Sequence, residues 1–385
     1  MFIEPHADDK EYSSVTQTGL AVAHVALQGA TELTRMVAET HATITRIPWI
    51  WQSHEVAQAQ QAPIPYQLVT HLFSNLAHFS YQFLNQTSIP ATQKGQLFYS
   101  ILNGVCGDTL KSWNSPLAQS MMLCDDEGCS LQGRSWAEGQ SRVVIFIHGL
   151  CLSEREWKNP AHTEFVDWLR TQGFAVAWVR YNSGLPIHEN GEDLNKLLEN
   201  ALGHDPARQL TLIGHSMGGL IIRSACHQAK TTGSAWLGQL HQSAYLGSPH
   251  RGAPLERLGN AFNNSLGLTP YSRPFMRLGN IRSQGIQDLR HGRLLPEDRD
   301  DEPVNLLPEI RHLLIGGHLN EGIERHWIGD GLVPVDSALA MNDNRATLSA
   351  PDLTRCELQQ INHFALLSDV RVYRVLQQWM QEVDQ

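Results

Sequence analysis

Residues 210–222 read Leu-Thr-Leu-Ile-Gly-His-Ser-Met-Gly-Gly-Leu-Ile-Ile, with a serine between an apolar strand pattern and an apolar helix pattern. Gly214 and Gly218 stand two positions either side of Ser216. Glycine at these places lets the chain turn sharply from strand to helix, and the turn leaves the serine hydroxyl exposed at the bend. The first N–H groups of the helix then point at the same spot, where they can stabilise a developing oxyanion. The stretch therefore predicts a nucleophilic serine in a strand–turn–helix unit, and a purely structural turn is the alternative.

A nucleophilic serine needs a base, and the base needs an acid that orients it. In folds built around this turn, the acid and then the histidine follow the serine along the chain. Asp330 lies in the tight turn Gly-Asp-Gly-Leu-Val, and Asp336 is its nearest rival. Beyond Asp330 the chain holds a single histidine, His363, although it has 19 in all. We therefore predict Ser216, Asp330 and His363 as catalytic residues, with Asp336 as the alternative acid.

A second apolar segment predicts where the oxyanion is bound. Residues 143–147 form a β-branched and aromatic run, which is typical of a strand buried on both faces of a parallel sheet. The run ends in His148-Gly149-Leu150. In folds of this kind one donor comes from the loop after that strand and the other from the residue after the nucleophile. The predicted donors are the backbone N–H groups of Leu150 and Met217, while the His148 side chain has a plainer alternative, a hydrogen bond within its own loop.

Together these segments resemble an α/β-hydrolase of the bacterial lipase and esterase kind, and most of all the GPI-inositol-deacylase-like group of serine esterases. The resemblance spans about residues 120–385 and rests on residues 146–150, 180–184, 214–219, 246–252, 329–334 and 362–364. It implies an α/β-hydrolase fold and cleavage of carboxylic esters, of small molecules or lipids, through an acyl-enzyme. It implies no metal and no organic cofactor. An acyltransferase on the same triad and a non-catalytic scaffold with this fold are the alternatives.

The chain is predicted to consist of an N-terminal helical region, residues 1–117, and a catalytic domain, residues 118–385. Apolar residues recur at intervals of three and four residues from about residue 18 to residue 106. Breaks that contain proline divide this stretch into about three helices. Such a region is either a helical layer on the catalytic domain or a separate interaction module. An insertion at about residues 253–310 is predicted to form a cap beside the serine.

Strand and helix patterns alternate through the catalytic domain, which predicts a mostly parallel sheet flanked by helices. After an entry hairpin near residues 121–131, strands are expected at residues 143–147, 174–179, 242–246, 312–316 and 356–360, in addition to the strand before Gly214. Helices are expected at residues 161–171, 192–202, 217–230 and 368–383.

Composition narrows the class of protein. Hydrophobic residues make up 42% and charged residues 18% of the 385 residues, which is typical of a globular chain. The net charge is −10 without a cluster of lysine or arginine, which argues against a nucleic-acid partner. The first residues lack the pattern of a signal peptide, and no run of about 18 apolar residues occurs. We expect a cytoplasmic protein with no transmembrane segment and with reduced cysteines, although Cys124 and Cys129 flank a turn and can pair in an oxidising compartment.

Overall fold

A computed structural model describes residues 23, 27–29, 93–133, 136–203, 205, 208–254, 283–296, 304–319, 328–341 and 348–382. The chain divides into two compact units, one of Met1–Leu97 with Ser115–Leu117 and one of Phe98–Asn114 with Ala118–Gln385. Most of the predicted N-terminal helices, and residues 255–282 of the predicted cap, lie outside the described residues. The predicted domain boundary at residue 117 and the cap therefore stay predictions.

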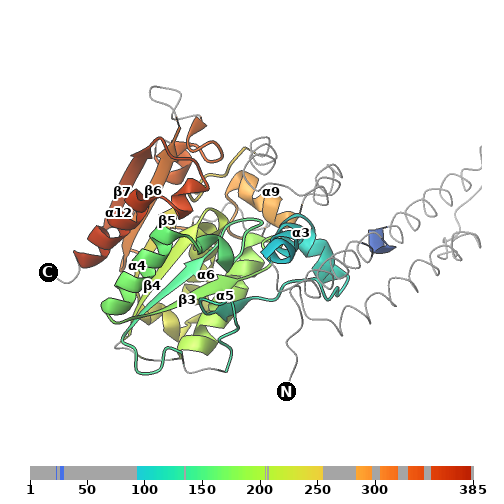
Figure 1. Ribbon diagram of the computed structural model, residues 1–385, viewed down its shortest axis with the longest axis horizontal. Coiled ribbons are helices and arrows are strands. Elements are labelled where there is room, and N and C mark those ends of the chain that lie inside the picture. The colour runs from blue at the N-terminus through green and yellow to red at the C-terminus, as the bar shows by residue number, and fades with distance from the viewer. Residues whose placement is uncertain are drawn as a thin grey trace, which may run out of the picture. The chain divides into compact units, whose positions relative to one another are not determined.

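The second unit is built on a seven-stranded sheet with the order β1-β3-β2-β4-β5-β6-β7 (Figure 1). Every pairing is parallel except that of β1 with β3. The strands are β1 (Met122–Cys124), β2 (Arg142–Ile147), β3 (Phe174–Arg180), β4 (Gln209–His215), β5 (Leu240–Leu246), β6 (Arg311–His318) and β7 (Leu353–Gln359). The expected hairpin is present as a short one, because the N–H of Leu131 donates to the carbonyl of Leu123 across 2.9 Å. The sheet confirms the predicted α/β-hydrolase fold class.

Helices cover both faces of this sheet (Figure 1). Val144 and Phe146 of β2 belong to one core cluster with α4 and α12, and the alternating residues Val143, Ile145 and Ile147 face the other way. All five are fully buried, which confirms the predicted strand with two buried faces. The helices are α3 (Gln93–Ser112), α4 (Pro160–Thr171), α5 (Ile187–Leu202), α6 (Met217–Thr232), α9 (Gln284–His291), α11 (Val335–Ala338) and α12 (Val370–Gln381), with short 3-10 turns η1 (Glu154–Trp157), η2 (Ala235–Gln239) and η4 (Ala365–Leu367).

Two predicted helix boundaries are wrong. Helix α5 begins at Ile187 instead of residue 192, because a distant side chain caps it: Oδ2 of Asp288 accepts the N–H of Ile187 across 2.9 Å. Gly191 lies inside this helix, where a Cβ would collide with Ser224 of α6, so the glycine permits close helix packing instead of breaking the helix. Helix α3 does not end at Cys106 but kinks there (φ −128°, ψ 15°) and continues to Ser112.

The remaining sequence predictions concern cysteines and membranes. The structure describes all six cysteines, and each thiol is free, including those of Cys124 and Cys129. Over the described ranges, no helix combines the length and the apolar character needed to cross a bilayer.

Candidate active site

Ser216 lies at the turn between β4 and α6 with φ 54° and ψ −121°. A positive φ is strained for a residue other than glycine, by about 1–3 kcal/mol, and persists where the surrounding structure holds it. Here the N–H of Ser216 donates to the carbonyl of Leu246 at the end of β5, across 2.8 Å. A Cβ at Gly218 would collide with the carbonyl oxygens of Ile147 and His148, so glycine lets α6 begin directly against the end of β2. The local packing therefore holds the sharp turn that the sequence predicts in a strained conformation.

The loop after β2 passes beside this serine. A Cβ built on Gly149 would lie 3.0 Å from Cβ of Ser216, which is tighter than an ordinary contact, so glycine favours this close approach. Leu150 and Met217, the predicted oxyanion donors, are both buried. In the part of the chain that the structure describes, neither backbone N–H donates to a backbone carbonyl. Both groups therefore remain available to an oxygen atom that forms at Ser216.

His363 and Asp330 form a buried pair. Nδ1 of His363 lies 2.7 Å from Oδ2 of Asp330, and the backbone N–H of His363 donates to the Asp330 carbonyl across 3.0 Å. The other carboxylate oxygen, Oδ1, accepts the N–H groups of Leu332 (2.9 Å) and Val333 (2.8 Å). A carboxylate oxygen accepts, so in the neutral imidazole of His363 the proton is on Nδ1 and Nε2 has the lone pair. The imidazole is thereby prepared to act as a base.

Two contacts tie this pair to the serine turn. Nε2 of His215 donates to the carbonyl of His363 across 3.0 Å, and their rings lie 4.8 Å apart. Burial, and to a lesser degree the nearby His363, holds the pKa of His215 well below its ordinary value, so His215 is a neutral donor. A Cβ on Gly247 would lie 3.2 Å from both Oδ2 of Asp330 and Cε1 of His363. Among the contacts of the described residues, no hydrogen bond joins the Ser216 hydroxyl to His363; such bonds are often long in unliganded enzymes.

A protein-family comparison matches this region. The model of the Alpha/beta hydrolase family matches residues 144–367, which is more than half of the chain. The chain belongs to the α/β-hydrolase family. No curated protein matches the hydrolase significantly.

Solved structures similar to this hydrolase have low sequence identity. Lipase BlEst2 of Bacillus licheniformis in its mature form is 16% identical, with 63% of this chain and 93% of that chain covered and a TM-score of 0.42. The RedJ thioesterase from the prodiginine biosynthetic pathway of Streptomyces coelicolor is 17% identical, with 63% and 86% covered and a TM-score of 0.43. Alpha/beta hydrolase domain-containing protein 10 from mouse is 12% identical, with 63% and 89% covered and a TM-score of 0.39.

The structure also brings residues to the site that the sequence analysis did not single out. His215 stands inside the decisive motif, and Gly247 inside one of the segments that carry the resemblance. The hydroxyl of Tyr181 and the hydroxyl of Ser183 contact the loop after β2. Their segment, residues 180–184, is one of the six on which the family resemblance rests, but its residue pattern does not indicate a catalytic role. His148 follows the plainer alternative, because its Nδ1 bonds the Gly149 carbonyl across 2.8 Å.

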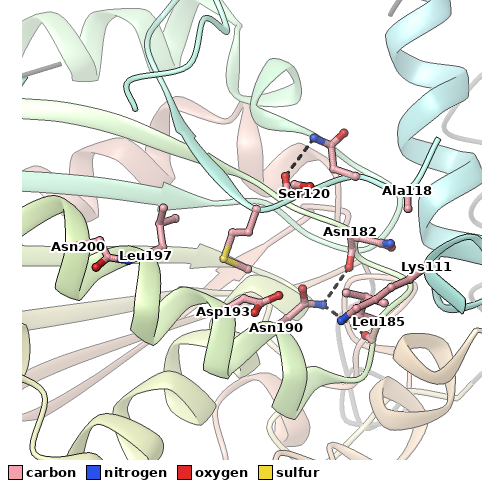
Figure 2. Close-up of a pocket in the computed structure, with 11 residues that line it drawn as sticks. Lys111, Ala118, Ser120, Asn182, Leu185, Asn190, Asp193, Leu197 and Asn200 are labelled. Carbon is pink, nitrogen blue, oxygen red and sulfur yellow. Dashed lines mark hydrogen bonds between the residues drawn. The ribbon is translucent and has the colours of Figure 1, made fainter. Parts of the chain in front are cut away.

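A separate cavity lies between α5, the end of α3 and the segment before β1 (Figure 2). Its volume is about 400 Å³, and its lining is rich in amides and includes the carboxylate of Asp193. The lining residues are Lys111, Ala118, Gln119, Ser120, Met121, Asn182, Leu185, Asn190, Asp193, Leu197 and Asn200. None of them is a predicted catalytic residue. Over the described part of the chain, no group of three or more His, Cys, Asp or Glu side chains is arranged to hold a metal ion.

Proposed function

We propose that this α/β hydrolase cleaves carboxylic esters, with Ser216 as the nucleophile, His363 as the base and Asp330 as the orienting acid. The observation that carries the proposal is the meeting of three features at one edge of the sheet. These are a serine on a strained strand–helix turn, a buried imidazole–carboxylate pair 2.7 Å apart, and a loop that lies against the serine at Gly149. This combination is what acyl transfer through an activated serine requires.

The chemistry follows from these positions. Nε2 of His363 takes the proton of the Ser216 hydroxyl as Oγ attacks the ester carbonyl, and Asp330 stabilises the imidazolium that forms. The N–H groups of Leu150 and Met217 receive the oxyanion, a contribution of about 2.7–4 kcal/mol per donor. The intermediate collapses, the alcohol leaves with the proton from His363, and the acyl group stays on Ser216. Water that His363 deprotonates then attacks the acyl carbon. The bond to Oγ of Ser216 breaks as Oγ takes that proton back from His363, and the acid is released.

The finer assignments belong to the same proposal. The likeness to bacterial lipases and esterases, and to the GPI-inositol-deacylase-like group in particular, rests on the six sequence segments between about residues 120 and 385. The substrate would accordingly be a small-molecule or lipid ester. A cap formed by the insertion at about residues 253–310 would line the acyl side of the pocket.

Labelling by a fluorophosphonate probe tests the nucleophile, together with hydrolysis of a short p-nitrophenyl ester. We expect Ser216→Ala to abolish labelling and to lower kcat by roughly six orders of magnitude, with an unchanged circular dichroism spectrum. Ser224→Ala is the matched control, because Ser224 is a fully buried serine on α6, the helix that follows Ser216. Labelling that persists in Ser216→Ala overturns the assignment.

The same assay separates the alternatives. Release of p-nitrophenol with transfer of the acyl group to an added alcohol, in preference to water, would identify an acyltransferase on the same residues. A wild-type chain that is folded but neither labelled nor active would be a non-catalytic scaffold.

A further inference from the structure

Residues 180–184, Arg-Tyr-Asn-Ser-Gly, carry part of the family resemblance but have no role in the proposed chemistry. Arg180 ends β3 and the other four follow it, and two of their side chains contact the loop after β2. The hydroxyl of Tyr181 donates to the carbonyl of His148 across 2.7 Å. The hydroxyl of Ser183 accepts the backbone N–H of Cys151 across 2.9 Å. Tyr181 and Ser183 are both buried, so water does not compete for these bonds.

A third hydrogen bond lies between these two along the loop. Nδ1 of His148 is 2.8 Å from the carbonyl oxygen of Gly149. A carbonyl oxygen can only accept, so Nδ1 carries the hydrogen. Burial lowers the pKa of His148 to about 4, so the imidazole is neutral near pH 7. Its ring also stacks on that of Tyr181, with centroids 4.2 Å apart and an angle of 17° between the planes.

These bonds hold three successive peptide groups. A trans peptide is planar, so the carbonyl of one residue and the N–H of the next point in opposite directions. Tyr181 thereby orients the peptide that joins His148 to Gly149, and Ser183 orients the peptide that joins Leu150 to Cys151. His148 orients the peptide between them, which carries the N–H of Leu150. We propose that Tyr181, Ser183 and His148 are positioning residues that aim the Leu150 N–H at the oxyanion formed at Ser216.

The loop after β2 contains a strained residue, and the hydrogen bonds described above oppose its relaxation. Cys151 has φ 59°, a left-handed conformation that is costly for a residue with a Cβ. It directly follows the proposed oxyanion donor, so relaxation of Cys151 would turn the neighbouring peptide. The Ser183 hydroxyl opposes that relaxation through the N–H of Cys151. Helix α3 opposes it from another side, because Gly104 lies so close to Cys151 that a Cβ there would collide with the thiol.

The segment after β3 is itself held from two sides. Nδ2 of Asn182 donates to the carbonyl of Gly107 in α3 across 3.0 Å. Nδ2 of Asn190 in α5 donates to the carbonyl of Asn182 across 3.0 Å, as Figure 2 shows. Hydrogen bonds to α3 and α5 therefore fix the segment that carries Tyr181 and Ser183. This support is what a positioning role requires, since a mobile partner would not hold a peptide plane.

The test deletes single hydroxyl groups. We expect Tyr181→Phe and Ser183→Ala each to lower kcat about tenfold, less than the roughly 10²–10³-fold cost of removing a whole oxyanion donor. KM should change less than about twofold, and a boronic acid that forms a tetrahedral adduct should bind more weakly in parallel with kcat. The matched controls are Tyr245→Phe and Ser224→Ala, which delete equally buried hydroxyl groups bonded to His312 and to the Leu294 carbonyl. The controls should keep kcat within about twofold of wild type.

A second measurement does not depend on activity. We expect Ser183→Ala to accelerate amide hydrogen exchange in residues 148–152, because the N–H of Cys151 loses its acceptor. Folded Tyr181→Phe and Ser183→Ala proteins with wild-type kcat, or with unchanged exchange in this loop, would overturn the inference. The catalytic part of the inference rests on the proposed function. Absence of Ser216-dependent hydrolysis in the wild type would overturn the proposed function. Faster exchange in Ser183→Ala would still show, independently of activity, that the Ser183 hydroxyl orders the loop.

Discussion

Nε2 of His215 donates to the backbone carbonyl of His363 across 3.0 Å, although 148 positions separate the two residues. His215 directly precedes the proposed nucleophile, and His363 is the proposed base. Their rings lie 4.8 Å apart, and His215 is fully buried. The turn that presents Ser216 and the loop that presents His363 are therefore joined by one neutral hydrogen bond.

We predict that His215→Leu lowers kcat about 10- to 100-fold with little change in KM, because a shift of the base by about 1 Å has an effect of this size. His215→Gln retains an N–H donor of similar reach and should recover part of the loss. Steady-state kinetics on a soluble ester measures both. Equal losses in the two variants would assign His215 to packing instead.

The two candidate acids can be separated by substitution. The carboxylate of Asp330 lies against the imidazole of His363, with 2.7 Å between Oδ2 and Nδ1. Asp330→Asn should lower kcat by about 10⁴, because an amide favours the wrong imidazole tautomer. Asp336→Asn should stay within a few-fold of wild type. The opposite ranking in kcat would move the acid to Asp336.

A substitution at Gly247 tests how closely the Asp330–His363 pair is packed. The φ of this glycine is +60°, and a Cβ would lie 2.7 Å from Cδ1 of Leu366 and 3.2 Å from both Oδ2 of Asp330 and Cε1 of His363. Gly247→Ala should lower kcat at least tenfold through displacement of the imidazole. Gly233→Ala is the matched control, because Gly233 has φ +71° with no atom within 4 Å of a Cβ. Both variants should lose stability, but only Gly247→Ala should lose kcat, as paired melting and kinetic measurements would reveal.

Buried histidines predict a loss of stability in mild acid. Burial lowers the pKa of His162 to about 3 and that of His148 to about 4, whereas both titrate near 6.5 in the unfolded chain. Below about pH 6.5 the unfolded chain therefore binds more protons, and the free energy of unfolding falls as the pH drops toward 4. Each histidine can contribute up to about 3 kcal/mol to this loss.

Urea denaturation at several values between pH 7 and pH 4.5 measures this slope. His162→Gln should be less stable at pH 7 but should show a shallower decline, because one titrating group is gone. Its amide oxygen can still accept the indole N–H of Trp178, which now donates to Nε2 of His162 across 3.3 Å. A slope equal to that of the wild type would assign the acid sensitivity to other groups.

Local sequence patterns determined the architecture of the catalytic unit. Residues 143–147 are apolar at every position, and the structure buries them on both faces of the sheet. Strand and helix alternation predicted a mostly parallel sheet, and the glycines around Ser216 predicted the sharp turn between β4 and α6. These features depend on side-chain periodicity and on steric limits of single residues, which neighbours in the sequence are sufficient to set.

Tertiary structure alone decided which distant groups meet. Asp288 accepts the N–H of Ile187 from 101 positions away, and no local sequence pattern shows that contact at the start of α5. The sequence left Asp330 and Asp336 both open, whereas the fold sets Oδ2 of Asp330 against His363. Tyr181 and Ser183 likewise reach the loop after β2 only because β2 and β3 pair in parallel and end at the same edge. Such contacts arise from the packing of whole elements, and that packing depends on the sum of many buried contacts and not on any one stretch of the chain.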